Sequence, residues 1–187
     1  MAIKIYIDQG HNPVNPNAGA EGSGYREQDL VYQIGIELAQ LLRDDPNYEV
    51  VLSRPTPETQ KGTTILTSLA ARVNEANNWP ADYFLSLHAN ASEISTANGL
   101  ESFVYSTQSP AYVLAQDINQ GLSDATGITN KGVYARPSLY VLRKTSMPAV
   151  LVEMGFITNQ YEADLMHDNP ALFGKGIYNG LNKYFGL

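Results

Sequence analysis

The chain has 187 residues, of which 43% are hydrophobic and 17% are charged, and this balance is typical of one globular domain. Its formal net charge of −7 argues against nucleic-acid binding, because phosphate groups require a basic protein surface. The absence of cysteine excludes disulfides, a cysteine nucleophile and thiolate metal ligands. Any transition-metal site must therefore be built from imidazole and carboxylate groups.

The pattern of hydrophobic residues predicts no membrane-spanning segment. No apolar stretch reaches about 18 residues, so we expect no insertion into a membrane. A strand begins within two residues of Met1, without the basic and apolar regions of a signal peptide. We therefore expect no signal peptide in this sequence.

Apolar runs alternate with segments of 3.6-residue periodicity, which predicts an α/β domain. The predicted strands cover residues 3–8, 49–53, 82–88, 99–106 and 149–154, with a weaker strand at 139–142. The predicted helices cover residues 27–43, 65–78, 110–126, 160–166 and 170–185. No internal repeat or linker divides the chain, so we expect a single domain spanning residues 1–187.

His11 is the first candidate for a functional residue, because it follows the strand 3–8 through Gln9 and Gly10. We expect Gly10 to allow a sharp turn at the end of this strand, so that the imidazole points across the sheet edge. In open α/β sheets, ligands bind beyond the carboxyl ends of the strands. An ordinary loop histidine without a function is the alternative.

Glu27 begins the helix 27–43 and lies on the same face as its apolar residues. These follow Glu27 at helical spacing: Val31, Ile34, Leu38 and Leu41. An inward-facing carboxylate requires a partner, and a metal ion would supply one. The alternative is a first-turn glutamate that the helix dipole stabilises by roughly 0.3–1 kcal/mol. Glu21 competes for the same role, whereas Asp29 is expected to face solvent.

His88 ends the apolar run 82–88, which is typical of a central strand buried on both faces. Ser86 and His88 share one face of this strand. A hydrogen-bonded core histidine is the alternative, but the position at the strand end favours a site at the sheet opening. Asn90 follows two residues later, either as a substrate contact or as a simple turn residue.

Glu153 ends a third apolar run, Val150-Leu151-Val152, and its apolar neighbours do not explain a glutamate there. Partial burial would raise its pKa and suit it to general acid–base catalysis. A fourth metal ligand, or a salt bridge to Arg72 or Arg143, is the alternative. Glu101 begins the next predicted strand and is expected to lie behind the site residues, in contact with them.

Other polar and aromatic residues are weaker candidates. His167 is expected to lie on the surface at a helix end, outside the site. Four tyrosines lie close to the candidate residues in the sequence, and we interpret most of them as packing residues, with one or two in a binding groove: Tyr25, Tyr105, Tyr134 and Tyr140.

Two imidazoles and one carboxylate, with a position left open for water, form a known catalytic zinc set. Zinc lowers the pKa of its bound water to about 7 and polarises a carbonyl group. The helical H-E-x-x-H motif is absent, as are G-x-S-x-G, Walker and G-x-G-x-x-G motifs. The pattern therefore indicates metal-assisted hydrolysis rather than serine or nucleotide chemistry.

The residues of the chain resemble the zinc-dependent N-acetylmuramoyl-L-alanine amidases, which cut bacterial cell walls. Members of that family open with a strand and D-P-G-H-G, where this chain has Asp8-Gln9-Gly10-His11-Asn12, and continue with a glutamate that opens the first long helix, here Glu27. Further similar blocks follow in the same order: VLSR at 51–54, SLAARVN at 68–74, SLHAN at 86–90, GLESF at 99–103, LYVLR at 139–143 and MPAVLVEMGF at 147–156. The chain departs at Gln9, where the family has proline, and at Asn12-Pro13, where it has glycines.

This resemblance implies a single domain with a mixed, mostly parallel central sheet of about six strands, flanked by helices on both faces. It implies that His11, Glu27 and His88 bind one Zn²⁺ and that Glu153 is the catalytic acid/base. The implied substrate is the amide between the lactyl group of N-acetylmuramic acid and L-alanine of the stem peptide. The alternatives are a zinc peptidase or amidohydrolase acting on another amide, and a non-catalytic wall-binding domain.

The same resemblance implies a bacterial autolysin or a phage endolysin. The partner is then peptidoglycan, both its glycan strand and its stem peptide, and the chain is expected to be a monomer. Action on this substrate implies an extracytoplasmic location at the cell wall, reached by secretion or by release at lysis.

Overall fold

A six-stranded sheet forms the centre of the structure, a computed structural model that describes residues 1–187. Its strands are β1 (Ile3–Gln9), β4 (Tyr48–Leu52), β5 (Tyr83–Asn90), β6 (Leu100–Val104), β7 (Asn130–Ala135) and β8 (Ala149–Phe156). They lie in the order β4-β1-β5-β8-β6-β7. Strands β4, β1, β5 and β8 are parallel to one another, and β6 and β7 run in the opposite direction. The sheet is therefore mixed and mostly parallel, as predicted.

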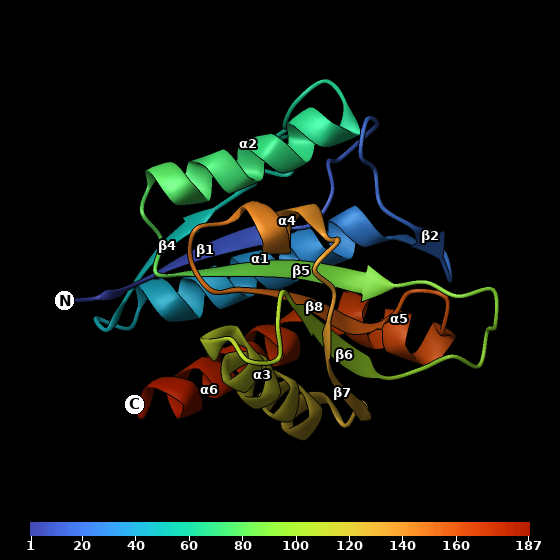
Figure 1. Cartoon of the computed structure of the whole chain (residues 1–187). Helices are drawn as coiled ribbons and strands as arrows, with labels where there is room; N and C mark the ends of the chain where they lie inside the picture. The colour runs from blue at the N-terminus through green and yellow to red at the C-terminus, as the bar shows by residue number, and fades with distance from the viewer.

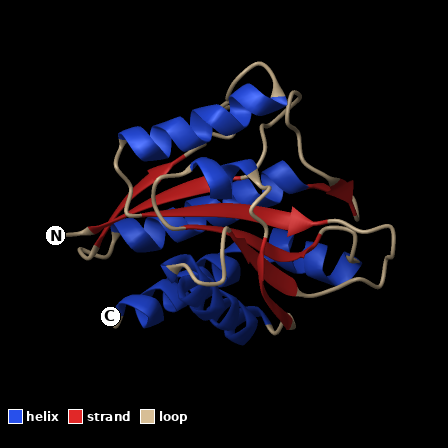
Figure 2. Cartoon of the chain, in the orientation of Figure 1, coloured by secondary structure: helices blue, strands red, loops and turns tan.

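Helices cover both faces of this sheet (Figures 1 and 2). They are α1 (Glu27–Arg43), α2 (Ile65–Asn78), α3 (Pro110–Thr126), α4 (Tyr140–Lys144), α5 (Gln160–Asp168) and α6 (Pro170–Phe185). The larger core lies between one face of the sheet and α1, α3 and α6, and the smaller core lies between the other face and α2 and α4. Alternation along β1 explains this division, because Ile5 and Ile7 enter the larger core and Tyr6 the smaller one.

The predicted strand at 139–142 is wrong, because this segment begins the short helix α4. The sixth strand is instead β7, which the sequence analysis did not identify. β7 lies at the edge of the sheet and is largely exposed, so it lacks the apolar run by which buried strands are recognised. A two-residue hairpin, β2 (Glu21–Gly22) and β3 (Tyr25–Arg26), also went unpredicted.

The adjacent parallel strands β1, β5 and β8 end at the same edge of the sheet. The loop after β1 leads through the β2–β3 hairpin to the first turn of α1. This topology brings His11, Glu27, His88 and Glu153 to one end of the domain. No helix of the structure is both long enough and apolar enough to cross a membrane.

Candidate active site

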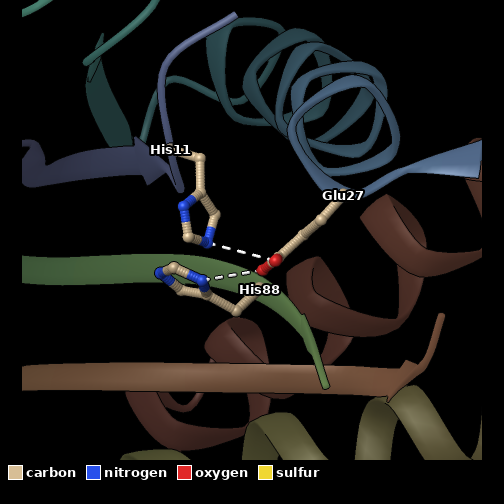
Figure 3. Close-up of side chains that lie close together, drawn as sticks. All are labelled: His11, Glu27 and His88. Atoms are coloured by element: carbon tan, nitrogen blue, oxygen red, sulfur yellow. Dashed lines mark hydrogen bonds and ion pairs between the residues drawn. The ribbon is translucent and has the colours of Figure 1, made fainter. Parts of the chain in front are cut away.

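Three side chains from distant parts of the sequence converge at this sheet edge (Figure 3). His11 Nε2 lies 3.1 Å from Glu27 Oε2, and His88 Nδ1 lies 2.9 Å from Glu27 Oε1. One ligand atom from each residue falls within 4.8 Å of the others. The two imidazole rings meet edge to face, with centroids 4.9 Å apart. The three residues that the sequence analysis selected as metal ligands therefore form one cluster.

Glu27 is held at the centre of the cluster by the protein backbone. The amide of Ala20 donates to Oε2 and the amide of Ala89 donates to Oε1, so each oxygen has a fixed direction. Burial alone would raise the pKa of Glu27, but its hydrogen bonds to His11 and His88 outweigh burial and hold the pKa well below the usual range. Glu27 is thus a buried carboxylate anion, and the inward orientation predicted from the helix pattern is confirmed.

His11 itself, and not Gly10, makes the turn at the end of β1. Its φ angle is +68°, in the left-handed region that residues with a β-carbon rarely adopt, whereas Gly10 has no positive φ. The expectation that Gly10 supplies the turn is therefore wrong. Gly10 is required for space instead, because a β-carbon there would lie 2.5 Å from His88 Cε1 and 2.6 Å from the Leu87 carbonyl oxygen.

This close packing predicts that Gly10→Ala will lower the free energy of unfolding by about 1–3 kcal/mol, the usual effect of overpacking. The ring of His88 can shift away from the new methyl group, but the backbone oxygen of Leu87 belongs to the central strand β5 and cannot. Urea-induced unfolding measures the difference. A variant as stable as the wild type would contradict the packing argument.

His88 uses both of its ring nitrogens. Nδ1 faces Glu27, and Nε2 lies 3.2 Å from the hydroxyl of Ser86, two residues earlier on the same strand face. Burial alone would lower the pKa of His88, but the hydrogen bond and charge of Glu27, with the charge of Glu153, raise the pKa to about 9. The ring is therefore protonated at neutral pH unless a metal ion displaces the proton on Nδ1.

Glu153 lies on β8 directly beside His88 of β5 and opposite Glu101 of β6. Its Oε2 is buried without a hydrogen-bond partner, and no arginine pairs with it. Burial raises the pKa of Glu153 to about 7; His88 opposes this rise, whereas the negative charges of Glu27 and Glu101 add to it. A carboxyl group with such a pKa can both accept and donate a proton near neutral pH.

One open cleft of about 540 Å³ contains His11, Glu27, His88 and Glu153 together. Arg136 also lines this cleft, and its guanidinium lies over the ring of Phe103, 5.0 Å from the ring centroid. Asn90 and Glu101 line the same cleft, and Asn90 Nδ2 donates to Glu101 Oε1 over 3.0 Å. The arrangement combines a cluster of metal-ligating atoms with an unpaired carboxyl group in a space that is open to a large substrate.

The model of the N-acetylmuramoyl-L-alanine amidase family matches residues 5–183. The chain belongs to this family. It is 32% identical to the N-acetylmuramoyl-L-alanine amidase CwlM of Bacillus licheniformis, over 99% of this chain and 70% of that protein. It is also 32% identical to the sporulation-specific N-acetylmuramoyl-L-alanine amidase of Bacillus subtilis, over 99% and 69%. The crystal structure of an N-acetylmuramoyl-L-alanine amidase from Clostridium difficile 630 superposes with a TM-score of 0.87 at 30% identity, over 99% and 97% of the two chains.

In this member of the amidase family, two of the three residues that depart from the family motif hold the loop after β1 in place. Asn12 is fully buried, and its side chain donates to the carbonyls of Pro16 and Lys61 and accepts from the Lys61 amide. Gln9 is also fully buried, and its Oε1 accepts the amide of Arg54. These two residues therefore supply hydrogen bonds around His11 without bonding to its imidazole.

The remaining candidates of the sequence analysis lie outside the amidase-family cluster. Glu21 is exposed, and Asp29 is exposed and pairs with Arg26. His167 stacks on Tyr25 and bonds to its neighbour Asp168, and Arg143 is exposed. Of the four tyrosines, only Tyr140 borders a cavity next to the histidines. Tyr25 instead bonds to Asp164 on α5, and Tyr134 to the carbonyl of Lys131.

A group of buried polar residues next to the two histidines was not predicted from the sequence. Asp8 and Arg72 form an ion pair, and Ser86 donates to Asp8. Two signals were present in the sequence: an acid inside the apolar run of β1, and a serine on the same strand face as His88. Neither identifies a partner, because Arg72 is 64 residues away from Asp8 in the chain.

Proposed function

We propose that this chain hydrolyses the amide bond between the lactyl group of N-acetylmuramic acid and L-alanine of the stem peptide in bacterial peptidoglycan. The observation that carries the proposal is the convergence of His11, Glu27 and His88 with Glu153 in one cleft of an amidase-family domain. Membership of the amidase family supports the identity of the bond that is cut. The lining of the cleft supports the assignment of the residues that cut it.

We propose Zn²⁺ as the cofactor, one per chain, held by His11, Glu27 and His88. The donor set fits, because two imidazoles and a carboxylate leave zinc an open position for catalysis. One ligand atom from each of the three residues lies within 4.8 Å of the others, so a single cation would be within reach of all three. Glu27 also has no lysine or arginine partner that would compete with a cation.

When bound, zinc polarises the amide carbonyl and lowers the pKa of the attacking water. Glu153 accepts a proton from that water and donates it to the nitrogen of L-alanine as this amine leaves. A carbon–oxygen bond to the lactyl carbonyl forms and the carbon–nitrogen bond breaks, so the products are a carboxylic acid and a free amine. Strand pairing places Glu153 beside His88, and the charges of His88 and Glu27 act on the pKa of Glu153 in opposite directions.

The proposed substrate defines where the protein acts. Peptidoglycan lies outside the cytoplasmic membrane, so the chain would act in the cell wall, after export or after release during lysis. All four site residues come from one chain, so the monomer that we propose has a complete site. Its partner is then the glycan strand together with the stem peptide.

Chelation of zinc should abolish hydrolysis, and added zinc should restore it. We expect about one zinc per purified chain, and release of soluble fragments with new L-alanine amino ends from purified peptidoglycan. His88→Ala should lose both zinc and hydrolysis. His167→Ala is the matched control, because it removes an exposed histidine outside the cluster and should retain both.

Each result has a separate meaning. A wild-type protein without zinc, purified from metal-replete cells, would contradict the proposed metal centre. Zinc binding without release of L-alanine amino ends would contradict the proposed substrate. Faster cleavage of a free stem peptide than of intact peptidoglycan would show a peptidase instead.

A further inference from the structure

A buried polar network lies directly beneath the two histidines. Asp8 is 2% exposed, Arg72 is 1% exposed and Ser86 is fully buried. They come from β1, α2 and β5, and only the fold brings them together. Buried charged groups are stable only when they are paired and hydrogen-bonded, and this network has both features.

The hydrogen bonds of this network run in one direction on the His88 side. Asp8 is paired with Arg72 and can only accept, so the single proton of Ser86 Oγ is donated to Asp8 Oδ2 over 2.8 Å. The lone pairs of Ser86 Oγ then face His88 Nε2 at 3.2 Å and accept its N–H. Because Nε2 donates its proton to Ser86, Nδ1 is the ring nitrogen that faces Glu27.

On the His11 side, Arg72 holds the backbone. Its Nη2 donates to the carbonyl oxygen of His11, and its Nη1 donates to Asp8 Oδ1 and to the carbonyl oxygen of Gln9. His11 has a φ angle of +68°, an unfavourable conformation that persists only where the surroundings impose it. The guanidinium therefore holds the backbone carbonyl of His11 and that of Gln9, two residues earlier, and so stabilises the left-handed conformation of His11.

From these contacts we infer that Asp8, Ser86 and Arg72 are positioning residues that orient both histidines toward the same metal ion. One ion pair connects the two: Asp8 acts through Ser86 on the ring of His88, and Arg72 acts on the backbone of His11. Hydrogen bonds of this kind behind a ligand histidine fix the ring and its protonated nitrogen. The inference rests on the proposed function for the identity of the metal, but the network itself exists without it.

Ser86→Ala is the sharpest test, because it removes only the hydroxyl that joins Asp8 to His88. Ser102→Ala is the matched control: Ser102 is also a fully buried strand serine with one side-chain bond, to Asn119, and it lies outside this network. Zinc dissociation constants are measured by competition with a chromophoric chelator. Unfolding of both metal-free variants in urea shows whether they lose equal stability.

We expect Ser86→Ala to bind zinc 10–100-fold more weakly than Ser102→Ala, the usual effect of losing a hydrogen bond behind a ligand. A second readout is independent of the metal. In ¹⁵N-labelled, metal-free protein, the Nε2 proton of His88 should exchange slowly in the wild type and in Ser102→Ala, and rapidly in Ser86→Ala.

Equal zinc affinity in the two variants would overturn the inference. So would a rapidly exchanging Nε2 proton in the metal-free wild type, because the bond to Ser86 would then be absent. If the wild type bound no zinc, the proposed cofactor would fail, and the exchange of the Nε2 proton would still decide whether Ser86 orients His88.

Discussion

Glu153→Gln should lower the rate of peptidoglycan hydrolysis by about 10²–10⁴-fold, the usual contribution of a general acid–base group. Glutamine keeps the size and polarity of the side chain but can neither accept the proton of water nor donate one to the leaving amine. The zinc ligands are unchanged, so the variant should still contain about one zinc per chain. The measurement is the appearance of L-alanine amino ends from purified peptidoglycan, together with zinc content.

Glu49→Gln provides the control for this experiment. Glu49 is an exposed glutamate on β4, at the far edge of the sheet from β8, so its loss should leave hydrolysis unchanged. A Glu153→Gln protein that binds zinc and hydrolyses within tenfold of the wild-type rate would show that another group transfers the proton. Glu101, which faces Glu153 across paired strands, would be the next residue to test.

Asp8→Asn should lower the free energy of unfolding of the metal-free protein by about 3–5 kcal/mol, because it leaves the guanidinium of Arg72 buried without its counter-charge. This is a large part of the 5–15 kcal/mol that is typical of a whole domain. Urea unfolding at neutral pH measures the loss. The control is Asp29→Asn, which breaks the exposed pair with Arg26 and should change stability by about 0–1 kcal/mol.

The stabilisation from Asp8 should also depend on pH. Burial alone would raise the pKa of Asp8, but the charge and hydrogen bond of Arg72 outweigh burial and hold the pKa below its usual value. The stabilisation is therefore complete above the pKa of the unfolded chain and is lost as the pH falls through the lower folded pKa. The difference between wild type and Asp8→Asn should shrink in acid; a difference that grew in acid would contradict the ion pair.

The elements of the fold with strong local patterns were predictable. The buried strands β1, β5 and β8 are apolar runs, and α1 and α6 have clear helical periodicity, so each was located within a few residues. The exposed edge strand β7 was not, because its sequence carries little apolar pattern. The short helix α4 was not, because the apolar run 139–142 is too short to distinguish a helix from a strand. In both cases the neighbouring strands and helices decide the conformation.

The convergence of His11, Glu27 and His88 was predictable because each has a topological marker, a strand end or the first turn of a helix. The location of Glu153 in the same cleft was predictable, because it ends a buried apolar run where packing does not explain a glutamate. The role of Gly10 was not, since the sequence signals a turn whereas the structure requires an empty space beside His88. Close approach between β1 and β5 is a property of their pairing, which no single strand encodes.

The sequence by itself determined the kinds of ligand available, their places at the ends of predicted elements and the family to which their order belongs. These properties depend on residue type and on short-range periodicity, which can be read along the chain. Only the tertiary structure decided which nitrogen of each histidine faces Glu27 and which residues hold the histidines in place. Arg72 meets Asp8 across 64 residues and Ser86 meets it across 78, and such contacts arise from strand pairing and helix packing.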